Sequence, residues 1–404
     1  MKIGIVTTWF ERGASYVSMQ YQELLEHLGH EVFIFSRGKS HDSNFGNTKN
    51  VFRAKPLPAP YPDKFDQDIF AKWLTNNEIE TVLFNEQKEM SPIVTCNKLN
   101  IKTGAYVDYY TEKTVKLFWA YDFLVCNTKM HYGVFKNHPQ AFYLPWGTNV
   151  DLFKPKSFDL AEKQIVTFFH SCGFSYYRKG TDLLINAFYE MQNTARLIIH
   201  AQIDLFEDLP KDCAKKLKEL VENNKCEVIS QTVSAPGLYH LGDIYVYPSR
   251  LDGLGLTMAE ALLCGLQLVI PDIQPMNEFG GKYRKLVKIA KTFKRNDDYY
   301  WPMNEIDHND LVNKLDEFAV QSKTITKQKK ETRKFALDKL DWSSRGSLLQ
   351  TIFIDSKILN SKEKENILNK ITSSKNLWNN KGLNYKIYSM NYRLYILLRR
   401  IFSK

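Results

Sequence analysis

Two carboxylates and two glycines occur together in one short segment of the chain. Asp252 and Glu260 lie on either side of a turn that contains Gly253 and Gly255. Where a helix follows such a turn, bare backbone N–H groups and the positive helix end gather at one point, and an anion such as a phosphate binds there. Carboxylates repel a phosphate but accept hydrogen bonds from hydroxyl groups. A ligand that carries both phosphates and hydroxyls, such as a sugar nucleotide, matches all four residues.

A buried strand and a helix must position this turn. The apolar run at 244–247 predicts the strand, and residues 257–264 predict the helix. Glycines at a strand-to-helix turn allow a ligand to approach the backbone closely. The N–H groups of Leu254, Leu256 and Thr257 are therefore candidate contacts for the ligand.

Apolar strands and amphipathic helices alternate along most of the remaining sequence. In the first 150 residues a helix is predicted at 16–28, after a loop that holds Gly13 and Ala14, together with strands at 2–7, 31–35, 81–84, 103–107, 123–126 and 141–144. A second alternating series extends from about residue 165 to residue 339. This order predicts an α/β protein with two doubly wound, Rossmann-like domains, and ligand sites at the carboxyl ends of the strands.

The segment 145–155, PWGTNVDLFKP, is rich in turn-forming residues, and we place the domain boundary there. The predicted first domain spans residues 1–150, and the second spans residues 151–340. Residues 341–360 are predicted to form a helix that returns to the first domain, and residues 361–404 a basic tail. A chain of 404 residues is long enough for two domains, because single cores rarely grow beyond ~250–300 residues.

The positive charge of the protein is concentrated in this tail. The net charge is +10, and residues 361–404 carry +8 of it, with 10 Lys and Arg against 2 Asp and Glu. Lys386, Arg393 and Arg400 recur every seven residues among many apolar ones, which predicts a basic amphipathic helix over 384–404. Such a helix suits an anionic membrane surface, and packing on the body or on a second subunit is the alternative. Because the body is nearly neutral, no nucleic-acid partner is expected.

Other features of the composition indicate a cytoplasmic protein. The N-terminal segment begins with a short apolar strand and lacks the pattern of a secretory signal. No stretch reaches the ~18 apolar residues of a membrane-spanning helix. The six cysteines form no CxxC pair, so buried reduced thiols are expected rather than a zinc site or disulfides.

Four motifs, in order along the chain, resemble those of the retaining glycosyltransferases of family 4, also called glycosyl transferases group 1. They are LPWGTNVDLFKP at 144–155, RKGTDLLINAF at 178–188, LGDIYVYPS at 241–249 and LDGLGLTMAEALLCG at 251–265. The resemblance covers roughly residues 1–353 and is stronger in the second domain than in the first. It implies the GT-B fold, in which two Rossmann-like domains face each other across a cleft.

The resemblance also implies roles for individual residues. Lys179, with Arg178, would neutralise the diphosphate of a nucleotide-sugar donor in the second domain. Glu260 would bind the ribose hydroxyls, and Asp252 would contact the transferred sugar. The implied catalytic residues are Asp108, Lys179 and Asp252, and the further donor-binding residues are Gly13, Ala14, Gly173, Gly253, Leu254, Gly255, Leu256 and Thr257. The implied reaction moves a sugar to an acceptor hydroxyl on the first domain, with retention of configuration and with neither metal nor cofactor; a UDP-sugar is the favoured donor.

Three positions depart from the family pattern. Asp252 stands where the family usually has glutamate, so its carboxylate reaches less far. The histidine that the family carries in its first domain has no counterpart, and Asp108 occupies the comparable position. An arginine that the family often places before its lysine is missing from residues 172–177, and Arg178 is the candidate substitute.

Several alternatives stay open from the sequence. Glu278 is a candidate for the rim of the pocket, and His131 and His170 are undecided between structural and functional roles. An inactive GT-B protein that binds a nucleotide sugar, or a GT-B epimerase, is the alternative to a transferase. If the tail binds a membrane, the protein is peripheral on the inner face of the cytoplasmic membrane. Its acceptor is then a glycan or a lipid-linked sugar, in synthesis of cell-surface polysaccharide, lipopolysaccharide or glycolipid.

Overall fold

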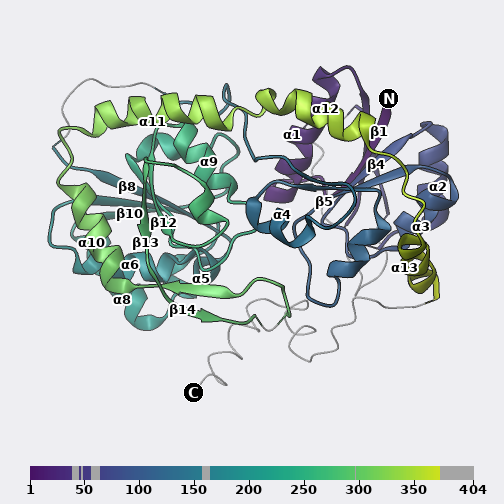
Figure 1. Cartoon of the computed structure of the whole chain (residues 1–404). Helices are drawn as coiled ribbons and strands as arrows, with labels where there is room; N and C mark the ends of the chain where they lie inside the picture. The colour runs from purple at the N-terminus through teal and green to yellow at the C-terminus, as the bar shows by residue number, and fades with distance from the viewer. Residues whose placement is uncertain (39–44, 47–48, 56–63, 157–163, 296, 374–404) are drawn as a thin grey trace.

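The computed structural model describes residues 1–38, 45–46, 49–55, 64–156, 164–295 and 297–373. Two lobes lie side by side, and each is built around one parallel sheet with helices packed on it (Figure 1). The predicted α/β class with two Rossmann-like domains is therefore confirmed. The two lobes are referred to below as the first and second domains.

A seven-stranded parallel sheet in the order β3-β2-β1-β4-β5-β6-β7 forms the first domain. Its strands are β1 (Lys2–Thr7), β2 (Glu31–Ser36), β3 (Val51–Arg53), β4 (Thr81–Asn85), β5 (Lys102–Tyr106), β6 (Phe123–Cys126) and β7 (Ala141–Tyr143). Its helices are α1 (Gly13–His27), α2 (Gln67–Asn76), α3 (Ser91–Lys98), the 3₁₀ helix η1 (Val115–Ala120) and α4 (Lys129–Phe135). The six strands predicted here are present to within one residue at each end. The three-residue strand β3 is too short to show a periodic pattern in the sequence.

The strand order of this sheet changes direction at β1, which pairs with β2 on one side and with β4 on the other. The chain leaves β1 and β4 at the same carboxyl edge of the sheet, because both strands run parallel. In open α/β sheets this switch point is where ligands bind. The segments after β1, β4 and β5 are therefore placed to form one wall of a site.

The second domain holds a six-stranded parallel sheet in the order β10-β9-β8-β11-β12-β13. Its strands are β8 (Thr167–Gly173), β9 (Arg196–Ala201), β10 (Cys226–Ser230), β11 (Ile244–Val246), β12 (Gln267–Pro271) and β13 (Arg284–Val287). Its helices are α5 (Tyr176–Lys179), α6 (Thr181–Glu190), α7 (Leu205–Asp208), α8 (Lys211–Glu222), η2 (Tyr239–Leu241), α9 (Leu256–Leu263), η3 (Met276–Glu278) and α10 (His308–Ala319). An antiparallel hairpin, β14 (Ile289–Phe293) with β15 (Met303–Ile306), extends toward the first domain (Figure 1).

Two helices join the domains along one side of the molecule. α11 (Ile325–Leu340) lies on the second domain, and α12 (Gly346–Asp355) lies nearly end to end with it on the first (Figure 1). The 3₁₀ turn η4 (Ser343–Arg345) separates them. α12 lies within the segment predicted to return to the first domain, and its Phe353 packs on Phe123 of β6 with ring centroids 5.3 Å apart.

The first part of the predicted basic tail is a packed helix. α13 (Lys362–Ser373) buries Leu368 and Ile371 in the hydrophobic core of the first domain. Its Lys364 forms an ion pair with Asp122, and the two side chains are only 4% and 1% exposed. The assignment of residues 361–373 to a tail is thus wrong, because a net charge count does not reveal a lysine that is buried and paired. The predicted amphipathic helix at 384–404 lies outside the described residues.

Buried apolar strands form the core of both domains, as expected for parallel sheets that are covered on both faces. All three residues of β11, Ile244, Tyr245 and Val246, are fully buried. All six cysteines are buried and free, as predicted. In the part of the chain that is described, no helix has the length and the apolar character needed to cross a bilayer.

Candidate active site

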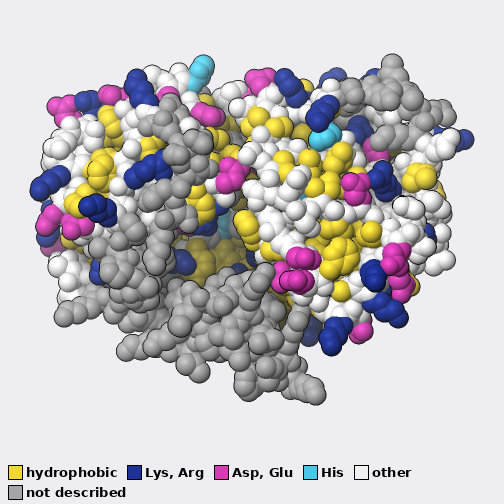
Figure 2. All heavy atoms as spheres, turned by 180° about the vertical axis from the view of Figure 1, so that it is seen from behind, with side chains coloured by type: hydrophobic (Ala, Val, Ile, Leu, Met, Phe, Trp, Pro, Cys, Tyr) yellow, Lys and Arg dark blue, Asp and Glu magenta, His cyan; other side chains and the backbone are white. Residues whose placement is uncertain are grey.

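A cavity of about 630 Å³ lies between the two domains. The first domain contributes the residues that follow β1, β4 and β5, and the second domain contributes those that follow β8 and β11. Seen from behind, the molecule is hollowed between its two halves (Figure 2). The carboxyl edges of both parallel sheets thus face one space, as the switch-point rule predicts.

The turn after β11 forms the floor of this cavity in the second domain. Gly255 lies at the start of α9 with a φ of +84°, a left-handed conformation that favours glycine. Asp252 accepts hydrogen bonds from the N–H groups of Leu254 at 3.2 Å and Gly255 at 3.0 Å. No side chain caps α9. Leu256 and Thr257 of its first turn line the cavity, so the positive end of the helix faces it.

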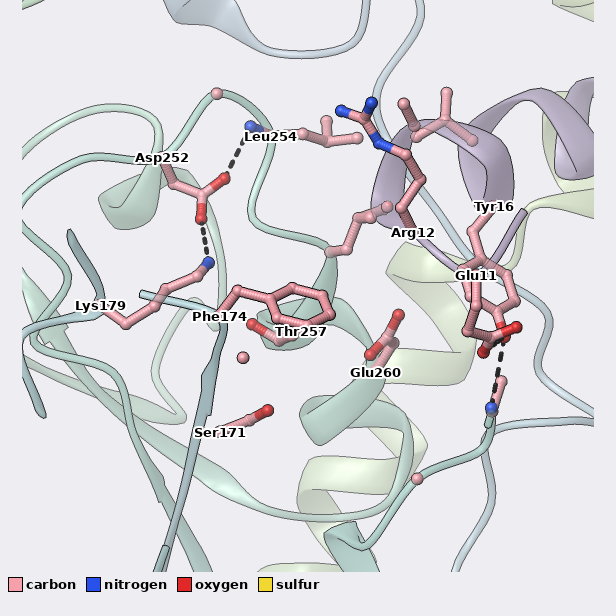
Figure 3. A pocket seen from close by; sticks show the side chains of 18 of the residues that line it. Glu11, Arg12, Tyr16, Ser171, Phe174, Lys179, Asp252, Leu254, Thr257 and Glu260 are labelled. Atoms are coloured by element: carbon pink, nitrogen blue, oxygen red, sulfur yellow. Dashed lines mark hydrogen bonds and ion pairs between the residues drawn. The ribbon is translucent and has the colours of Figure 1, made fainter. Parts of the chain in front are cut away.

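The second oxygen of Asp252 binds Lys179, with 2.8 Å between Lys179 Nζ and Asp252 Oδ2 (Figure 3). The two side chains are 13% and 12% exposed, and the Tyr247 hydroxyl contacts both. Burial and the charge of Arg178 lower the pKa of Lys179 to about 8. Burial alone would raise the pKa of Asp252, but the charges of Lys179 and Arg178 outweigh it and hold that pKa well below its ordinary value. An ionised pair therefore lies at the cavity wall at neutral pH.

A buried arginine fixes the segment that carries Lys179. Arg250 binds both carboxylate oxygens of Asp182 at 2.7 and 2.8 Å, and its guanidinium lies 4.1 Å from the Tyr177 ring centroid. Its backbone N–H donates to the Arg178 carbonyl at 2.8 Å. Bidentate arginine–carboxylate pairs constrain geometry as well as adding energy. Arg250 thereby connects the end of β11 to the α5–α6 junction and holds Lys179 over the turn.

Glu260 lies on α9, further along the cavity from Asp252 (Figure 3). The Tyr239 hydroxyl donates to its Oε2. Burial raises the pKa of Glu260 to about 7, although the Tyr239 hydrogen bond and the charge of Lys179 act in the opposite direction. When it is ionised, the Glu260 carboxylate can therefore accept hydrogen bonds from hydroxyl groups of a ligand, and the Tyr239 hydroxyl holds its orientation.

Acidic groups dominate the wall that the first domain contributes. Glu86 follows β4 with a φ of +52°, and its carboxylate binds Arg12 at 2.8 Å. Asp108 follows β5, and burial together with the charge of Glu86 raises its pKa to about 7. In Figure 3 the Leu254 side chain of the second-domain turn points toward Arg12. This wall offers acceptors for hydroxyl groups, and its arginine is already paired.

Residues 165–290 match the model of the family described as Glycosyl transferases group 1. Solved structures match most of the chain: a glycosyltransferase from Rickettsia africae ESF-5 has a TM-score of 0.65 and 15% identity, over 88% of this chain and 99% of that one. The sucrose-phosphate synthase of Thermosynechococcus elongatus has a TM-score of 0.66 and 14% identity, over 88% and 98% of the two chains. The chain has the GT-B fold.

HepE of Anabaena, solved in complex with UDP and glucose, also has this fold, with a TM-score of 0.64 and 13% identity over 88% of this chain and 100% of HepE. No curated protein matches the sequence. At these identities the likeness to solved structures establishes the fold alone. The resemblance to glycosyl transferases group 1 and the GT-B architecture, both inferred from the sequence motifs, are confirmed.

The GT-B cavity brings together nearly all the residues singled out in the sequence. They line it from both domains, as Gly13, Ala14, Asp108, Gly173, Arg178, Lys179, Asp252, Gly253, Leu254, Leu256, Thr257 and Glu260. Gly255 lies behind this lining, where it shapes the turn. Gly13 and Ala14 were expected in a loop but belong to the first turn of α1, which begins three residues earlier than predicted. A Cβ on Gly13 would lie 3.2 Å from Leu256 Cδ1, so the two domains come close together there.

Three further candidates, Glu278, His170 and His131, do not line the GT-B cavity, and the contacts of His131 are described below. Glu278 accepts hydrogen bonds from the N–H groups of Lys129 at 2.7 Å and Met130 at 2.9 Å, so it caps α4 of the opposite domain instead of forming the rim of the pocket. His170 is fully buried and bonds to the Val246 carbonyl and the Thr181 hydroxyl, both at 2.8 Å. Its role is structural, since it joins β8 to β11 and α6. No group of His, Cys, Asp or Glu side chains within the described ranges is arranged to hold a metal ion.

Sequence reasoning missed four residues of the GT-B site. Tyr247 and Tyr239 lie in apolar patterns, and only the fold shows that their hydroxyls reach Asp252 and Glu260. Arg250 lies between the motifs at 241–249 and 251–265 and belongs to neither of them. Phe174 lines the cavity with a side chain that is 60% exposed, which is unusual for a large aromatic residue. The available signal for Arg250 was a charged residue three positions after the predicted buried strand at 244–247.

Proposed function

We propose that this GT-B protein transfers a sugar from a nucleotide-sugar donor to an acceptor hydroxyl, with retention of the anomeric configuration. One observation carries the proposal. A single cavity presents a buried lysine, an uncapped helix end and a tyrosine-held carboxylate on one domain, and carboxylates on the other. The first three suit a nucleoside diphosphate, since the cation and the helix end attract phosphates and the carboxylate accepts from ribose hydroxyls.

In the proposed complex the second domain holds the donor. Lys179 and Arg178 neutralise the charge that develops on the diphosphate as the bond to the sugar breaks, which is the largest single contribution such a site can make. The N–H groups at the start of α9 contact the same phosphates. We favour a UDP-sugar, because HepE, which shares the fold, has been solved with UDP and with UDP-glucose.

Asp252 has two roles in the proposed complex. Its two oxygens accept from the turn and from Lys179, so it holds the cation and the backbone in place. A hydroxyl of the transferred sugar would share one of these oxygens. Asp108, across the cavity, is assigned to orient the acceptor hydroxyl. The leaving phosphate takes the proton of that hydroxyl, so no second carboxylate at glycosidase spacing and no metal ion is required.

A panel of UDP-, GDP- and ADP-sugars tests the proposal. Incubation with the full chain, followed by detection of free nucleotide diphosphate and by NMR of the anomeric proton, should show turnover of a UDP-sugar with retained configuration. An inverted product would overturn the mechanism. Epimerised donor would indicate a GT-B epimerase, and tight nucleotide binding without turnover would indicate an inactive binding protein.

Nucleotide binding should weaken as the pH falls through about 7. The pKa of Glu260 is raised to about 7 by burial, and only the ionised carboxylate accepts two hydroxyl hydrogen bonds. Bound ribose favours the ionised form, so below pH 7 the binding of a nucleotide releases a proton. Kd therefore rises by up to ~10-fold for each unit by which the pH falls. Calorimetric titration of UDP between pH 5.5 and 8.5 measures both effects. Glu260→Gln, which does not titrate, should bind more weakly at pH 8 and lose the pH dependence.

We also propose that the protein acts on the inner face of the cytoplasmic membrane, on a glycan or lipid-linked acceptor of cell-surface polysaccharide or glycolipid synthesis. The support is the basic, apolar pattern of residues 384–404. Sedimentation with anionic vesicles should retain the full chain and lose a chain that ends at residue 382. Equal sedimentation of the two chains would exclude this role of the tail.

A further inference from the structure

A chain of three hydrogen bonds crosses between the two domains beside the donor-binding turn. Trp301, on the hairpin connection of the second domain, donates from Nε1 to the Tyr110 hydroxyl at 2.7 Å. The Tyr110 oxygen lies 2.9 Å from His131 Nδ1, and His131 Nε2 lies 3.0 Å from the Gly253 carbonyl oxygen. The chain thus begins and ends in the second domain, and its two middle members, Tyr110 and His131, belong to the first.

The donors and acceptors of this chain leave one consistent arrangement. A carbonyl oxygen only accepts, so His131 Nε2 carries the proton and donates to Gly253. His131 Nδ1 then accepts from the Tyr110 hydroxyl, and the Tyr110 oxygen accepts from Trp301, which can only donate. Both His131 and Tyr110 are fully buried or nearly so, and burial lowers the pKa of His131 to about 4. The imidazole is therefore neutral at physiological pH and satisfies every group of the chain.

The peptide that receives the last of these bonds is the centre of the donor-binding turn. Its carbonyl belongs to Gly253, and its N–H, on Leu254, donates to Asp252 at 3.2 Å. A glycine has wide conformational freedom, and the space around a Cβ on Gly253 is open to 4.0 Å. Hydrogen bonds on both sides of this peptide plane therefore limit its rotation, one from within the second domain and one from the opposite domain.

The helix that carries His131 is itself held by the second domain. Glu278 accepts hydrogen bonds from the first two N–H groups of α4, at Lys129 and Met130. His131 follows directly, so the second domain positions the helix start and receives the histidine bond in return. These contacts exist only while the two domains are together.

We propose that His131 is a positioning residue that locks the donor-binding turn from the opposite domain. The inference about donor affinity rests on the proposed function, whereas the locking of the turn does not. Contact between the domains then completes the donor site by fixing the Gly253–Leu254 peptide, and with it the N–H groups that follow at the start of α9. Nucleotide affinity thereby becomes sensitive to a residue that contacts no ligand.

Substitution of His131 by phenylalanine tests this, because it keeps an aromatic ring and removes both hydrogen bonds. In hydrogen-exchange measurements on the full-length, ligand-free protein, the amides of Leu254 and Gly255 should exchange about fivefold faster in His131→Phe than in the wild type. This factor corresponds to the loss of one hydrogen bond with a net contribution of about 1 kcal/mol. UDP affinity measured by calorimetry should fall by about the same factor. His131→Gln, whose amide can donate to Gly253 and accept from Tyr110, should restore much of both.

His138→Phe is the matched control. His138 is also buried in the first domain and bonds to the Tyr121 carbonyl at 3.2 Å, within its own domain. This variant should lose comparable thermal stability yet leave exchange at Leu254 and UDP affinity unchanged. Unchanged exchange in His131→Phe, or equal changes in both variants, would overturn the inference. If the wild-type protein binds no nucleotide, the proposed function fails, while the exchange data still decide whether His131 locks the turn.

Discussion

Replacing Lys179 with methionine should lower kcat/KM for the nucleotide sugar by about 10²–10³-fold, the range found when one charge-stabilising group is removed from an active site. Lys179 is the least exposed cation of the cavity wall, and its ammonium group lies 2.8 Å from Asp252. Methionine keeps the length and the apolar contacts of the side chain but provides no charge for the leaving diphosphate. Initial rates of donor turnover under subsaturating conditions measure the loss.

The pH profile gives a second readout of the same residue. Since burial and Arg178 lower the pKa of Lys179 to about 8, the free protein loses this cation as the pH rises through 8. The wild-type kcat/KM, which reports groups of the free enzyme, should therefore decline above pH 8, and this decline should be missing from Lys179→Met.

Lys216→Met is the control for Lys179→Met. Lys216 is also partly exposed and hydrogen-bonded, to Asn186 at 2.9 Å, but it lies in the same domain away from the cavity. It should retain full activity. If both variants fold normally and Lys179→Met keeps an activity within threefold of the wild type, the lysine does not stabilise the leaving group.

Gly180→Ala should both destabilise the second domain and abolish tight donor binding. Gly180 has a φ of +70°, and a Cβ there would lie 2.0 Å from the Pro248 carbonyl oxygen, which belongs to the backbone and has little room to move. The left-handed conformation costs ~1–2 kcal/mol for alanine, and the overlap adds ~1–3 kcal/mol or more. Relief of the overlap must displace the adjacent Lys179 from the turn, so UDP affinity should fall together with the urea midpoint.

Gly29→Ala separates the two contributions. Gly29 also has a positive φ, +84°, but no atom lies within 4 Å of a Cβ at this position. This variant should therefore show only the conformational cost of ~1–2 kcal/mol and normal UDP binding. Equal urea midpoints for Gly180→Ala and Gly29→Ala would contradict the close packing of the RKG segment against Pro248.

Much of the fold could be predicted from local patterns. The strands of the first sheet are nearly continuous apolar runs bounded by polar or turn-forming residues, as parallel strands covered on both faces must be. The turn at 252–255 was recognisable because an anion site requires glycines next to a helix start. Such features depend on residues that are neighbours in sequence, so they are readable without knowledge of the fold.

Contacts between distant segments were not predictable in this way. Glu278 and Lys129 are far apart in sequence, and only the packing of the domains makes the glutamate a helix cap instead of a pocket residue. Lys364 counted as part of a basic tail, yet it is buried against Asp122. In each case the function of the charge depends on a partner that no local pattern specifies.

The sequence by itself determined the two-domain α/β class, the GT-B family likeness and the segments that surround the cavity. Three contacts were decided by the tertiary structure alone. Asp252 accepts hydrogen bonds from Lys179 and from the N–H groups of its own turn, and the Tyr239 hydroxyl donates to Glu260. His131 donates to the Gly253 carbonyl from the other domain. The physical reason is the distance along the chain between the residues that interact. Periodicity and turn chemistry act over a few residues, whereas hydrogen-bond partners, burial and the resulting pKa values arise only when remote segments are brought into contact.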